Sequence, residues 1–589
     1  MLRSFNFVPA NRPSRPLSEH GEGRSVRAPR FQRYLVLGVL ACFASIGFAQ
    51  SSKLSKELQN ISGTATTDVI VQFYASPSQG DLDGVSINGG GGGKMKQLLD
   101  GIKGASYTLP GNSIKALATN PKVRYVTPDR PVSGHLEFAE PAVNASIALQ
   151  YGWNGTGVGV AVIDSGIYAS HPDLQNGSSS RVVYAQSFVP NDTTTNDAYG
   201  HGTHVAGIVG GNGANSTGSN MIYTFRGIAP KVNLINLRVL DASGSGTDSA
   251  VINAIQKAIS LKSQYNIRVI NLSLGRQVTE SYTLDPLCQA VEAAWNAGIV
   301  VVVSAGNNGR DNSMNTNGYD TITSPGNDPF VITVGAMKDM STVSRGDDVI
   351  GSYSSKGPTL LDHVVKPDLV APGNQIVSAR SPNSALITNY PNNQVPVSFY
   401  KSTNYQGMSS SYFTLSGTSM AAPMVSGASA LLLQQNPSMT PDQVKARLMK
   451  TATKNFPVSS VACDPVTSIC YTSRYDIFTI GAGYLDVWAA LNSSDLAQGT
   501  AASPVAQYNA STGTVSVVLA NNVVWGTSGL WGTNVVWGTN AVSGTNIVWG
   551  DNVVWGTSTL TGFNVVWGTN VVWGTSQPFS EALSIKGEN

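Results

Sequence analysis

The sequence predicts an α/β protein whose parallel β-sheet is covered by helices on both faces. Between residues 157 and 304, apolar runs alternate with segments of helical period, which is the pattern of strand–helix units. The runs at 157–167 and 298–304 are almost continuously apolar, as strands buried on both faces should be. A smaller α+β domain is expected before this region, and a β-rich hexapeptide repeat after it.

Length and charge narrow the class of protein. A chain of 589 residues is expected to form about two to four structural units. Its 37 basic and 35 acidic residues nearly cancel, so we expect no nucleic-acid partner. We also expect the protein to be a monomer.

Residues 1–49 have the features of a secretory signal sequence. Residues 1–33 are rich in arginine, residues 34–48 are apolar, and the small residue Ala49 follows. The apolar run is shorter than the roughly 20 residues needed to span a bilayer. We therefore expect a secreted, extracellular protein cleaved near Ala49, with an uncleaved anchor at the cell surface as the alternative.

Residues 50–135 contain no candidate catalytic residue and are predicted to form the small α+β domain. Strand patterns occur at 69–73 and 123–126, and short helical patterns at 94–102 and 114–118. The glycines at 89–93 are expected to form a flexible loop.

The α/β domain is expected over residues 136–492. The strand at 157–167 carries Asp164 near its carboxyl end, where open α/β sheets place their ligands and catalytic groups. His201 opens a helix, and strands at 232–240 and 267–273 flank a helix at 247–262. Ser419 precedes the apolar helix 424–433, and a further helix is expected at 440–451. Residues 372–416 are expected to form a long surface loop.

Asp164, His201 and Ser419 are the candidate catalytic residues. A serine at the start of a buried helix is fixed in place, and it needs a base that takes its proton. The order Asp, His, Ser along the chain is one of three that converge on the same triad geometry. An aspartate at a strand end can also simply cap the next turn. His204 lies near His201 on the helix, but no third ligand with zinc-like spacing accompanies the two histidines.

Two motifs carry a family resemblance. The stretch from Gly417 to Pro423 (Gly-Thr-Ser-Met-Ala-Ala-Pro) and the Gly-His-Gly-Thr-His run at 200–204 resemble the subtilisin-like serine proteases (subtilases, peptidase S8) over residues 140–492. The resemblance implies a subtilisin-like fold and an Asp164–His201–Ser419 triad. The histidine also argues against the related serine-carboxyl proteases, which use a carboxylate base.

The resemblance also implies further roles. Asn307 would donate to the oxyanion, and Ser273, Leu274 and Gly275 would pair with an extended peptide substrate. Residues 50–135 resemble an inhibitory propeptide in position and element order, with a permanent accessory domain as the alternative. We therefore expect a secreted serine endopeptidase that is made as a self-processed zymogen. It would act on protein or peptide substrates, with its own propeptide as an intramolecular inhibitor.

No cofactor is expected to be required, although calcium is considered at Asp173. The His-Pro-Asp-Leu segment around Asp173 resembles a calcium-ligating segment of several relatives. The loop at 212–223, which would complete that site, is longer and richer in Gly, Ser and Asn than the resemblance requires. Cys463 and Cys470 are close enough to form a disulfide in an exported protein, which leaves Cys288 as a buried, inert thiol.

A polar linker is expected at 493–520, followed by a hexapeptide repeat at 521–576 and an end segment at 577–589. The repeat unit is Asn-Val-Val-Trp-Gly-Thr, with glycine at every sixth residue. Because six is even, side-chain alternation stays in register between copies, which favours a small β-solenoid or stacked ribbon. The repeat is either a structural stalk or a platform that binds a cell surface or polysaccharide. The alternative function is therefore a surface-binding or adhesive protein whose protease domain mainly processes itself.

Overall fold

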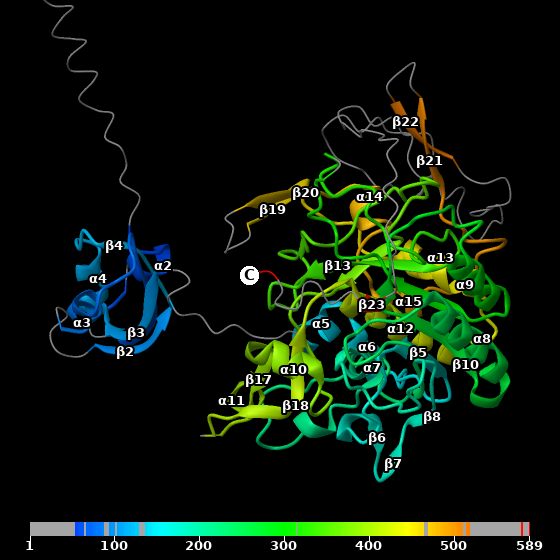
Figure 1. Ribbon diagram of the computed structural model, residues 1–589, viewed down its shortest axis with the longest axis horizontal. Helices are drawn as coiled ribbons and strands as arrows, with labels where there is room; N and C mark the ends of the chain where they lie inside the picture. Colours follow the sequence, from blue (N-terminus) through cyan, green and yellow to red (C-terminus); the bar gives the residue numbers. More distant parts are fainter. Residues whose placement is uncertain are drawn as a thin grey trace, which may run out of the picture. The chain divides into compact units, whose positions relative to one another are not determined.

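A computed structural model describes two separate units of the chain. The described residues are 53–518 without 60, 64–65, 88–92, 100–102, 129–135, 314, 404, 464–468 and 510–513, together with 579–580 and 588. The units are residues 1–132 and 133–589, and Figure 1 draws both. The signal sequence and the hexapeptide repeat predicted from the sequence lie outside the described residues.

The first unit is a four-stranded antiparallel sheet with helices. Its sheet order is β2-β3-β1-β4, and the chain order β-α-β-β-α-β is that of a split βαβ unit. The elements are α2 (Lys56–Gln59), β1 (Thr66–Phe73), α3 (Gln79–Ile87), β2 (Lys94–Leu99), β3 (Gly104–Pro110), α4 (Gly111–Leu117) and β4 (Val123–Pro128).

One helix predicted in this unit is wrong. Residues 94–102 have apolar side chains at a helical spacing, yet Lys94–Leu99 forms the edge strand β2, which pairs antiparallel with β3. Most of its side chains stay outside the core. The backbone pairing with β3, and not the helical spacing of its apolar residues, therefore decides its conformation. The helix lies instead at Gln79–Ile87. The strands predicted at 69–73 and 123–126 and the helix at 114–118 are confirmed.

The second unit is built on an eight-stranded, mostly parallel sheet. Its order is β14-β13-β12-β10-β5-β9-β8, with β15 also paired to β13, and only β14 runs antiparallel. The strands are β5 (Gly159–Asp164), β8 (Val182–Ser187), β9 (Asn233–Arg238), β10 (Ile267–Leu272), β12 (Val300–Ser304), β13 (Ile332–Lys338), β14 (Val349–Ile350) and β15 (Leu369–Pro372). The predicted parallel α/β sheet is confirmed.

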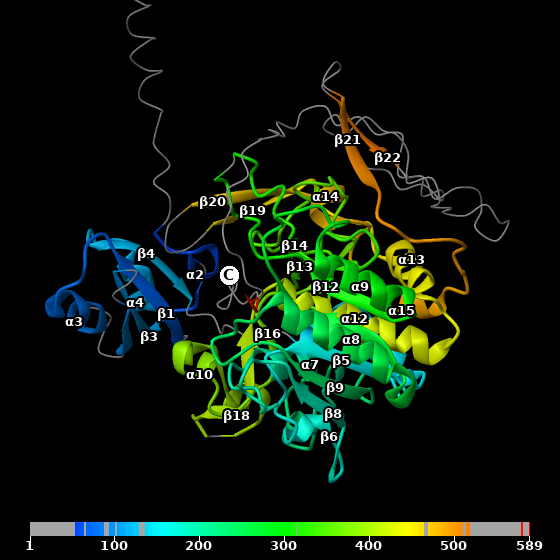
Figure 2. The same ribbon diagram turned by 45° about the vertical axis from the view of Figure 1, so that its right-hand side comes forward.

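Helices cover both faces of this sheet, as Figure 2 shows. Helix α7 (His201–Gly210) packs on α12 (Thr418–Gln435), while α8 (Asp248–Tyr265) packs on α9 (Pro286–Asn296). Thr247 caps α8, and Thr440 forms a capping box with Gln443 at the start of α13 (Pro441–Thr451). The predicted helices at 201, 247, 424 and 440 are therefore confirmed, with shifted ends.

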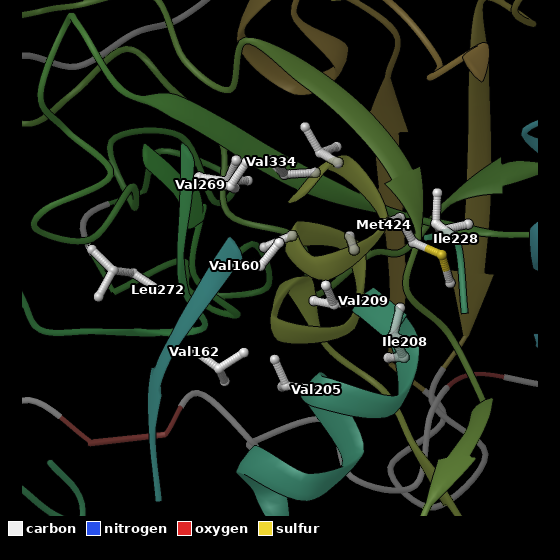
Figure 3. Close-up of a cluster of buried hydrophobic side chains, with 14 of the residues drawn as sticks. Val160, Val162, Val205, Ile208, Val209, Ile228, Val269, Leu272, Val334 and Met424 are labelled. Atoms are coloured by element: carbon white, nitrogen blue, oxygen red, sulfur yellow. The ribbon is translucent and has the colours of Figure 1, made fainter. Parts of the chain in front are cut away.

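The core between the sheet and the α7–α12 layer fixes where these two helices begin. Figure 3 shows Val160 of β5, Val269 of β10, Val205 and Val209 of α7, and Met424 of α12 within one buried cluster. Each of these side chains is almost completely inaccessible to solvent. Because such interiors are close-packed, the beginnings of α7 and α12 are held in a fixed relation to the sheet.

Two segments predicted to be irregular contain regular structure. Residues 372–416 form the sheet β16-β18-β17 rather than a loop, with β16 (Ile376–Ala379), β17 (Gln394–Pro396) and β18 (Met408–Leu415). The predicted linker at 493–520 contains a hairpin of β21 (Val505–Asn509) and β22 (Thr514–Val518). Hydrogen bonds attach this segment to the second unit, including one from Lys445 Nζ to Ser503 Oγ of 2.9 Å and one from Ala506 N to His363 O of 2.7 Å.

Short elements complete the second unit. They are α5 (Leu136–Ala142), α6 (Ala145–Gln150), β6 (Gln175–Asn176), β7 (Ser179–Ser180), β11 (Leu274–Gly275), α10 (Ala385–Asn389), α11 (Val397–Tyr400), β19 (Ser459–Cys463), β20 (Cys470–Arg474), α14 (Ile477–Ile480), α15 (Val487–Asn492) and β23 (Phe579–Ser580), with 3₁₀ turns at Pro172–Leu174, Ala214–Ser216 and Pro391–Asn393. Within the described part of the chain, no helix is both long and apolar enough to cross a membrane.

The cysteines are arranged as predicted. Cys463 and Cys470 form a disulfide across the β19–β20 hairpin. Cys288 is a free, buried thiol whose Sγ lies 3.3 Å from Asn327 Oδ1. Burial raises the pKa of the Cys288 thiol well above its ordinary value, so the reactive thiolate is disfavoured.

Candidate active site

Asp164 and His201 form a buried pair. Asp164 is the last residue of β5 and His201 the first of α7, and their side chains are 1% and 0% exposed. His201 Nδ1 lies 2.8 Å from Asp164 Oδ1. This contact fits an imidazole whose Nδ1–H donates to the carboxylate, an arrangement that assigns proton exchange to Nε2.

The start of α7 is adapted to this close approach. Gly200 has a φ of 108°, a conformation that favours glycine. A Cβ on Gly202 would lie 2.2 Å from the Gly166 carbonyl oxygen and 3.1 Å from Asp164 Cβ, so only glycine fits there. The glycines of the Gly-His-Gly-Thr-His motif are therefore required by the backbone conformation at Gly200 and by the close contact at Gly202.

Asp197 holds the same helix start and was missed by sequence reasoning. Its Oδ1 accepts hydrogen bonds from Gly200 N at 2.6 Å and Ser165 Oγ at 2.8 Å, and its Oδ2 accepts one from Thr203 N at 2.7 Å. Ser165 Oγ in turn accepts from Gly202 N at 2.9 Å. An acidic residue shortly before a helix start is a capping signal that could have indicated the bonds to Gly200 N and Thr203 N, whereas the bond to Ser165, 32 residues earlier, has no local signal.

His204 is a structural residue. Its Nε2 lies 3.0 Å from the carbonyl oxygens of both Ile376 and Phe413, which connects α7 to strands β16 and β18. Burial, and secondarily the nearby His201, lowers the pKa of His204 to about 3, so its imidazole stays neutral. The assignment of the base to the first histidine of the motif is consistent with this geometry.

Ser419 is the second residue of α12 and is fully buried. Its Oγ lies 3.3 Å from the carbonyl oxygen of Ser273, and Ser273 Oγ donates to the Ser419 carbonyl at 2.8 Å. These contacts join the nucleophile candidate to the residue that precedes β11. Because α7 and α12 pack together, the helix starts that carry His201 and Ser419 belong to the same layer.

Asn307 is held beside the serine by Thr418. Its Oδ1 accepts hydrogen bonds from Thr418 N at 2.9 Å and from Thr418 Oγ1 at 3.2 Å. Thr418 Oγ1 also accepts one from Gly306 N at 3.1 Å. Since Thr418 fixes the oxygen end of the amide, the Asn307 nitrogen is directed away from Thr418, as a preorganised donor would be. Sequence reasoning missed the role of Thr418.

The predicted substrate-binding residues lie directly after the central strand β10; they are Ser273, Leu274 and Gly275. Ser273 follows β10, and Leu274 and Gly275 form β11. Both β11 residues pair antiparallel with β23 near the end of the chain. This edge therefore already pairs with one strand from a distant part of the sequence.

Asp173 already has two protein partners. Its Oδ1 accepts from Asn215 N at 2.8 Å, and its Oδ2 accepts from the Tyr412 hydroxyl at 2.8 Å. In the described residues no group of three or more His, Cys, Asp or Glu side chains could hold a metal ion. Both oxygens of the Asp173 carboxylate therefore accept hydrogen bonds from protein donors, and calcium at this position stays a prediction from the sequence. His171, beside it, bonds Asp173 N and the Ser411 carbonyl and is structural.

The chain is similar to several known proteins. The model of the subtilase family (peptidase S8) matches residues 155–464. Serine protease AprX of Bacillus subtilis is 40% identical over 375 residues, which cover 62% of this chain and 77% of that protein. Subtilisin E of Bacillus subtilis is 35% identical over 423 residues, or 71% of this chain and 91% of that protein. Subtilisin DY of Bacillus licheniformis is 37% identical over 316 residues, or 54% and 91%.

A crystal structure of a cold adapted subtilisin-like serine proteinase is also similar, with 29% identity and a TM-score of 0.38, covering 57% of this chain and 90% of that one. The family model covers more than half of this chain, and the chain covers most of each of these curated relatives. The chain therefore belongs to the subtilase family and is a serine-type endopeptidase.

Proposed function

We propose that this subtilase is a secreted endopeptidase that cleaves peptide bonds through an acyl-enzyme, with Asp164, His201 and Ser419 as its triad. The observation that carries the proposal is the buried 2.8 Å contact between His201 Nδ1 and Asp164 Oδ1. It orients the imidazole so that Nε2 is the nitrogen that exchanges protons.

The reaction would have two halves. Ser419 Oγ attacks the carbonyl carbon of the scissile bond while His201 Nε2 takes the hydroxyl proton and then gives it to the leaving amine. Water, deprotonated by the same nitrogen, then attacks the acyl carbon; the ester bond to Ser419 Oγ breaks, the acyl group leaves as a carboxylic acid, and His201 returns the proton to Oγ. Asp164 stabilises the imidazolium in both halves. The Asn307 amide and the Ser419 backbone N–H would donate to the oxyanion.

Substrate would bind as an extended strand along β11. Main-chain pairing with Leu274 and Gly275 holds many sequences in one register, and selectivity is left to side-chain pockets. The β23 pairing at this edge supports the proposal, because it is a strand added in the same manner. Protein and peptide substrates are therefore expected.

We further propose that the protein is made as a zymogen and exported. The leader at 1–49 supports export, and the β-α-β-β-α-β unit that precedes the catalytic unit supports an inhibitory propeptide. Helix α5 begins at Leu136, and its Ala139 and the following Val143 are buried in the core of the second unit. A cut within α5 would break this helix, and one beyond Ala139 would detach part of the core, so we expect the cut before Leu136, between Asp129 and His135.

Fluorophosphonate labelling of the secreted protein tests this proposal. We expect label on Ser419, lost in Ser419→Ala and His201→Ala, and a new N-terminus between Asp129 and His135 by mass spectrometry. Ser429→Ala is the matched control, because it removes a buried hydroxyl from the same helix. This hydroxyl donates to the Val425 carbonyl, four residues earlier, at 2.8 Å. Folded, propeptide-free protein that takes no label on Ser419 would refute the triad.

The tryptophan-rich repeat supports a second role as a binding platform. Deleting residues 521–576 tests this role. A larger deletion that also included the linker would remove the β21–β22 hairpin, which belongs to the second unit. The platform predicts unchanged turnover of a soluble peptide and lost binding to insoluble polysaccharide. Unchanged retention on the polysaccharide would leave the repeat as a stalk.

A further inference from the structure

Glu588 lies in a polar pocket that the proposed mechanism does not use. The residue is 7% exposed although it follows a long stretch of repeats. Its Oε1 lies 2.5 Å from Arg310 Nη2 and accepts a hydrogen bond from Ser352 N at 3.0 Å and another from Ser352 Oγ. Charge-assisted bonds are the strong ones, so the Arg310 contact favours an acidic side chain at this position.

The same pocket holds the main chain of Glu588. Asn374 binds both backbone polar groups of Glu588. Its Oδ1 accepts from Glu588 N at 2.8 Å, and its Nδ2 donates to Glu588 O at 2.9 Å. Gln375 Nε2 donates to the same carbonyl at 3.1 Å. The pocket therefore holds Glu588 by both its backbone and its acidic side chain.

Arg310 is positioned in advance for this contact. Its Nε donates to Ser352 Oγ at 2.7 Å, and its guanidinium lies 4.9 Å from the ring centroid of Tyr471. Both contacts limit the orientations of the guanidinium, which lowers the entropy cost of holding a carboxylate. Arg310 is therefore preorganised to bind an acidic side chain.

The pocket adjoins the segments of the active site. Gln375 N donates to Ser416 Oγ at 2.7 Å, and Gly417 N donates to the Gly373 carbonyl at 2.8 Å, directly before Thr418 and Ser419. Arg310 follows Asn307 by three residues on the segment that carries the oxyanion donor. The residues that bind Glu588 are therefore linked to the segments that carry the proposed nucleophile and oxyanion donor.

A second contact places the same part of the chain on the substrate strand. Phe579 pairs with Gly275 and Ser580 with Leu274, in an antiparallel register. In going from Phe579 to Ser580, the chain passes from Gly275 to Leu274 and so advances toward Ser273, whose side chain touches the Ser419 main chain. An edge strand has one free row of hydrogen-bonding groups, so β23 and a peptide substrate cannot both occupy β11 on this side.

We propose that Arg310, Ser352, Asn374 and Gln375 form an acid-recognising peptide site which binds Glu588 and thereby keeps β23 on β11, in competition with substrate. The ligand class is an extended peptide segment with a glutamate, and the occupant is this segment of the chain itself. The competition rests on the proposed function, whereas the binding site stands on its own contacts.

Steady-state kinetics of the mature, full-length protein tests the competition. Glu588→Gln keeps the shape of the side chain but loses the charge that pairs with Arg310, and we expect it to lower the KM for a peptide nitroanilide about tenfold at unchanged kcat. Asp311→Asn is the matched control, because it removes an equal charge from an exposed side chain next to Arg310. Equal KM values for the two variants would overturn the competition.

Hydrogen exchange tests the site without any need for turnover. In mature protein treated with phenylmethylsulfonyl fluoride, the amides of the peptide that contains Leu274 and Gly275 should exchange at least tenfold faster in Glu588→Gln than in the parent or in Asp311→Asn. Exchange at an unchanged rate, or loss of residues 577–589 from the mature parent by mass spectrometry, would overturn the proposal. In either case, label on Ser419 would leave the triad intact.

Discussion

Replacing Thr418 by valine removes the hydroxyl that supports the oxyanion donor without changing the shape of the side chain. In the structure this hydroxyl accepts from Gly306 N at 3.1 Å and donates to Asn307 Oδ1 at 3.2 Å. The backbone bond from Thr418 N to Asn307 Oδ1, at 2.9 Å, remains in the variant. Thr418 does not touch the reacting atoms in the proposed mechanism, so it is a positioning residue.

The structure sets the size of the expected effects. A buried N–H that loses its acceptor costs about 1–3 kcal/mol, and Gly306 N–H becomes such a group, so the free energy of unfolding should fall by that amount. Loss of a whole oxyanion donor lowers kcat by about 10²–10³-fold. Because one of the two bonds to Asn307 survives, we expect Thr418→Val to lower kcat by only about 5–10-fold.

The assay compares kcat, KM and urea unfolding for Thr418→Val and Thr418→Ser. The serine variant keeps the hydroxyl and loses one methyl group, which costs about 1 kcal/mol of stability by reduced burial but should leave kcat within twofold. A valine variant that is destabilised as expected but turns over substrate like the serine variant would refute the reasoning. A change in KM alone would refute it as well, because the contact should act on the transition state.

Three further outcomes follow from the same geometry. Asn307→Ala should lower kcat by about 10²–10³-fold with little change in KM, whereas Asn308→Ala should not; equal kcat values would remove Asn307 from the oxyanion site. Gly202→Ala should lower both kcat and thermal stability, although alanine favours helices by about 1 kcal/mol, because its Cβ would meet the Gly166 carbonyl at 2.2 Å; a more stable, fully active variant would contradict this. The pKa of His204 is lowered to about 3, so below pH 6.5 the unfolded chain binds a proton that the folded chain does not. The free energy of unfolding should therefore fall from pH 6.5 toward pH 3, by at most about 1.4 kcal/mol per pH unit from this group, and a urea series whose midpoint is flat over this range would exclude it.

The candidate site residues could be proposed from the sequence because local patterns surround them. Asp164 ends a continuously apolar strand, and His201 and Ser419 begin helices whose apolar side chains form the core. Glycine is required beside them for steric reasons, as at Gly202, where a Cβ would lie 2.2 Å from the Gly166 carbonyl oxygen. Such signals lie within a few residues of the side chain they position, so a single sequence contains them.

The supporting contacts were not predictable in the same way. Asp197 holds Ser165 from 32 residues away, and Thr418 holds Asn307 from 111 residues away. The edge strand Lys94–Leu99 shows the same limit, because its helical spacing of apolar residues yields to pairing with β3. In each case the contacting residue is distant in the sequence, so the local spacing of apolar residues cannot indicate it.

The loop at Ser416–Thr418 connects the two proposals, which makes their independence testable. Its first residues contact Gln375 and Gly373 beside the Glu588 pocket, and its last residue supports Asn307. Release of Glu588 should change only how substrate competes for β11, whereas loss of the Thr418 hydroxyl should change only the transition state. The double variant Glu588→Gln with Thr418→Val should therefore combine the lower KM of one with the lower kcat of the other. Effects that do not combine would mean that the loop transmits pocket occupancy to the oxyanion donor, because coupled changes at neighbouring sites are not additive.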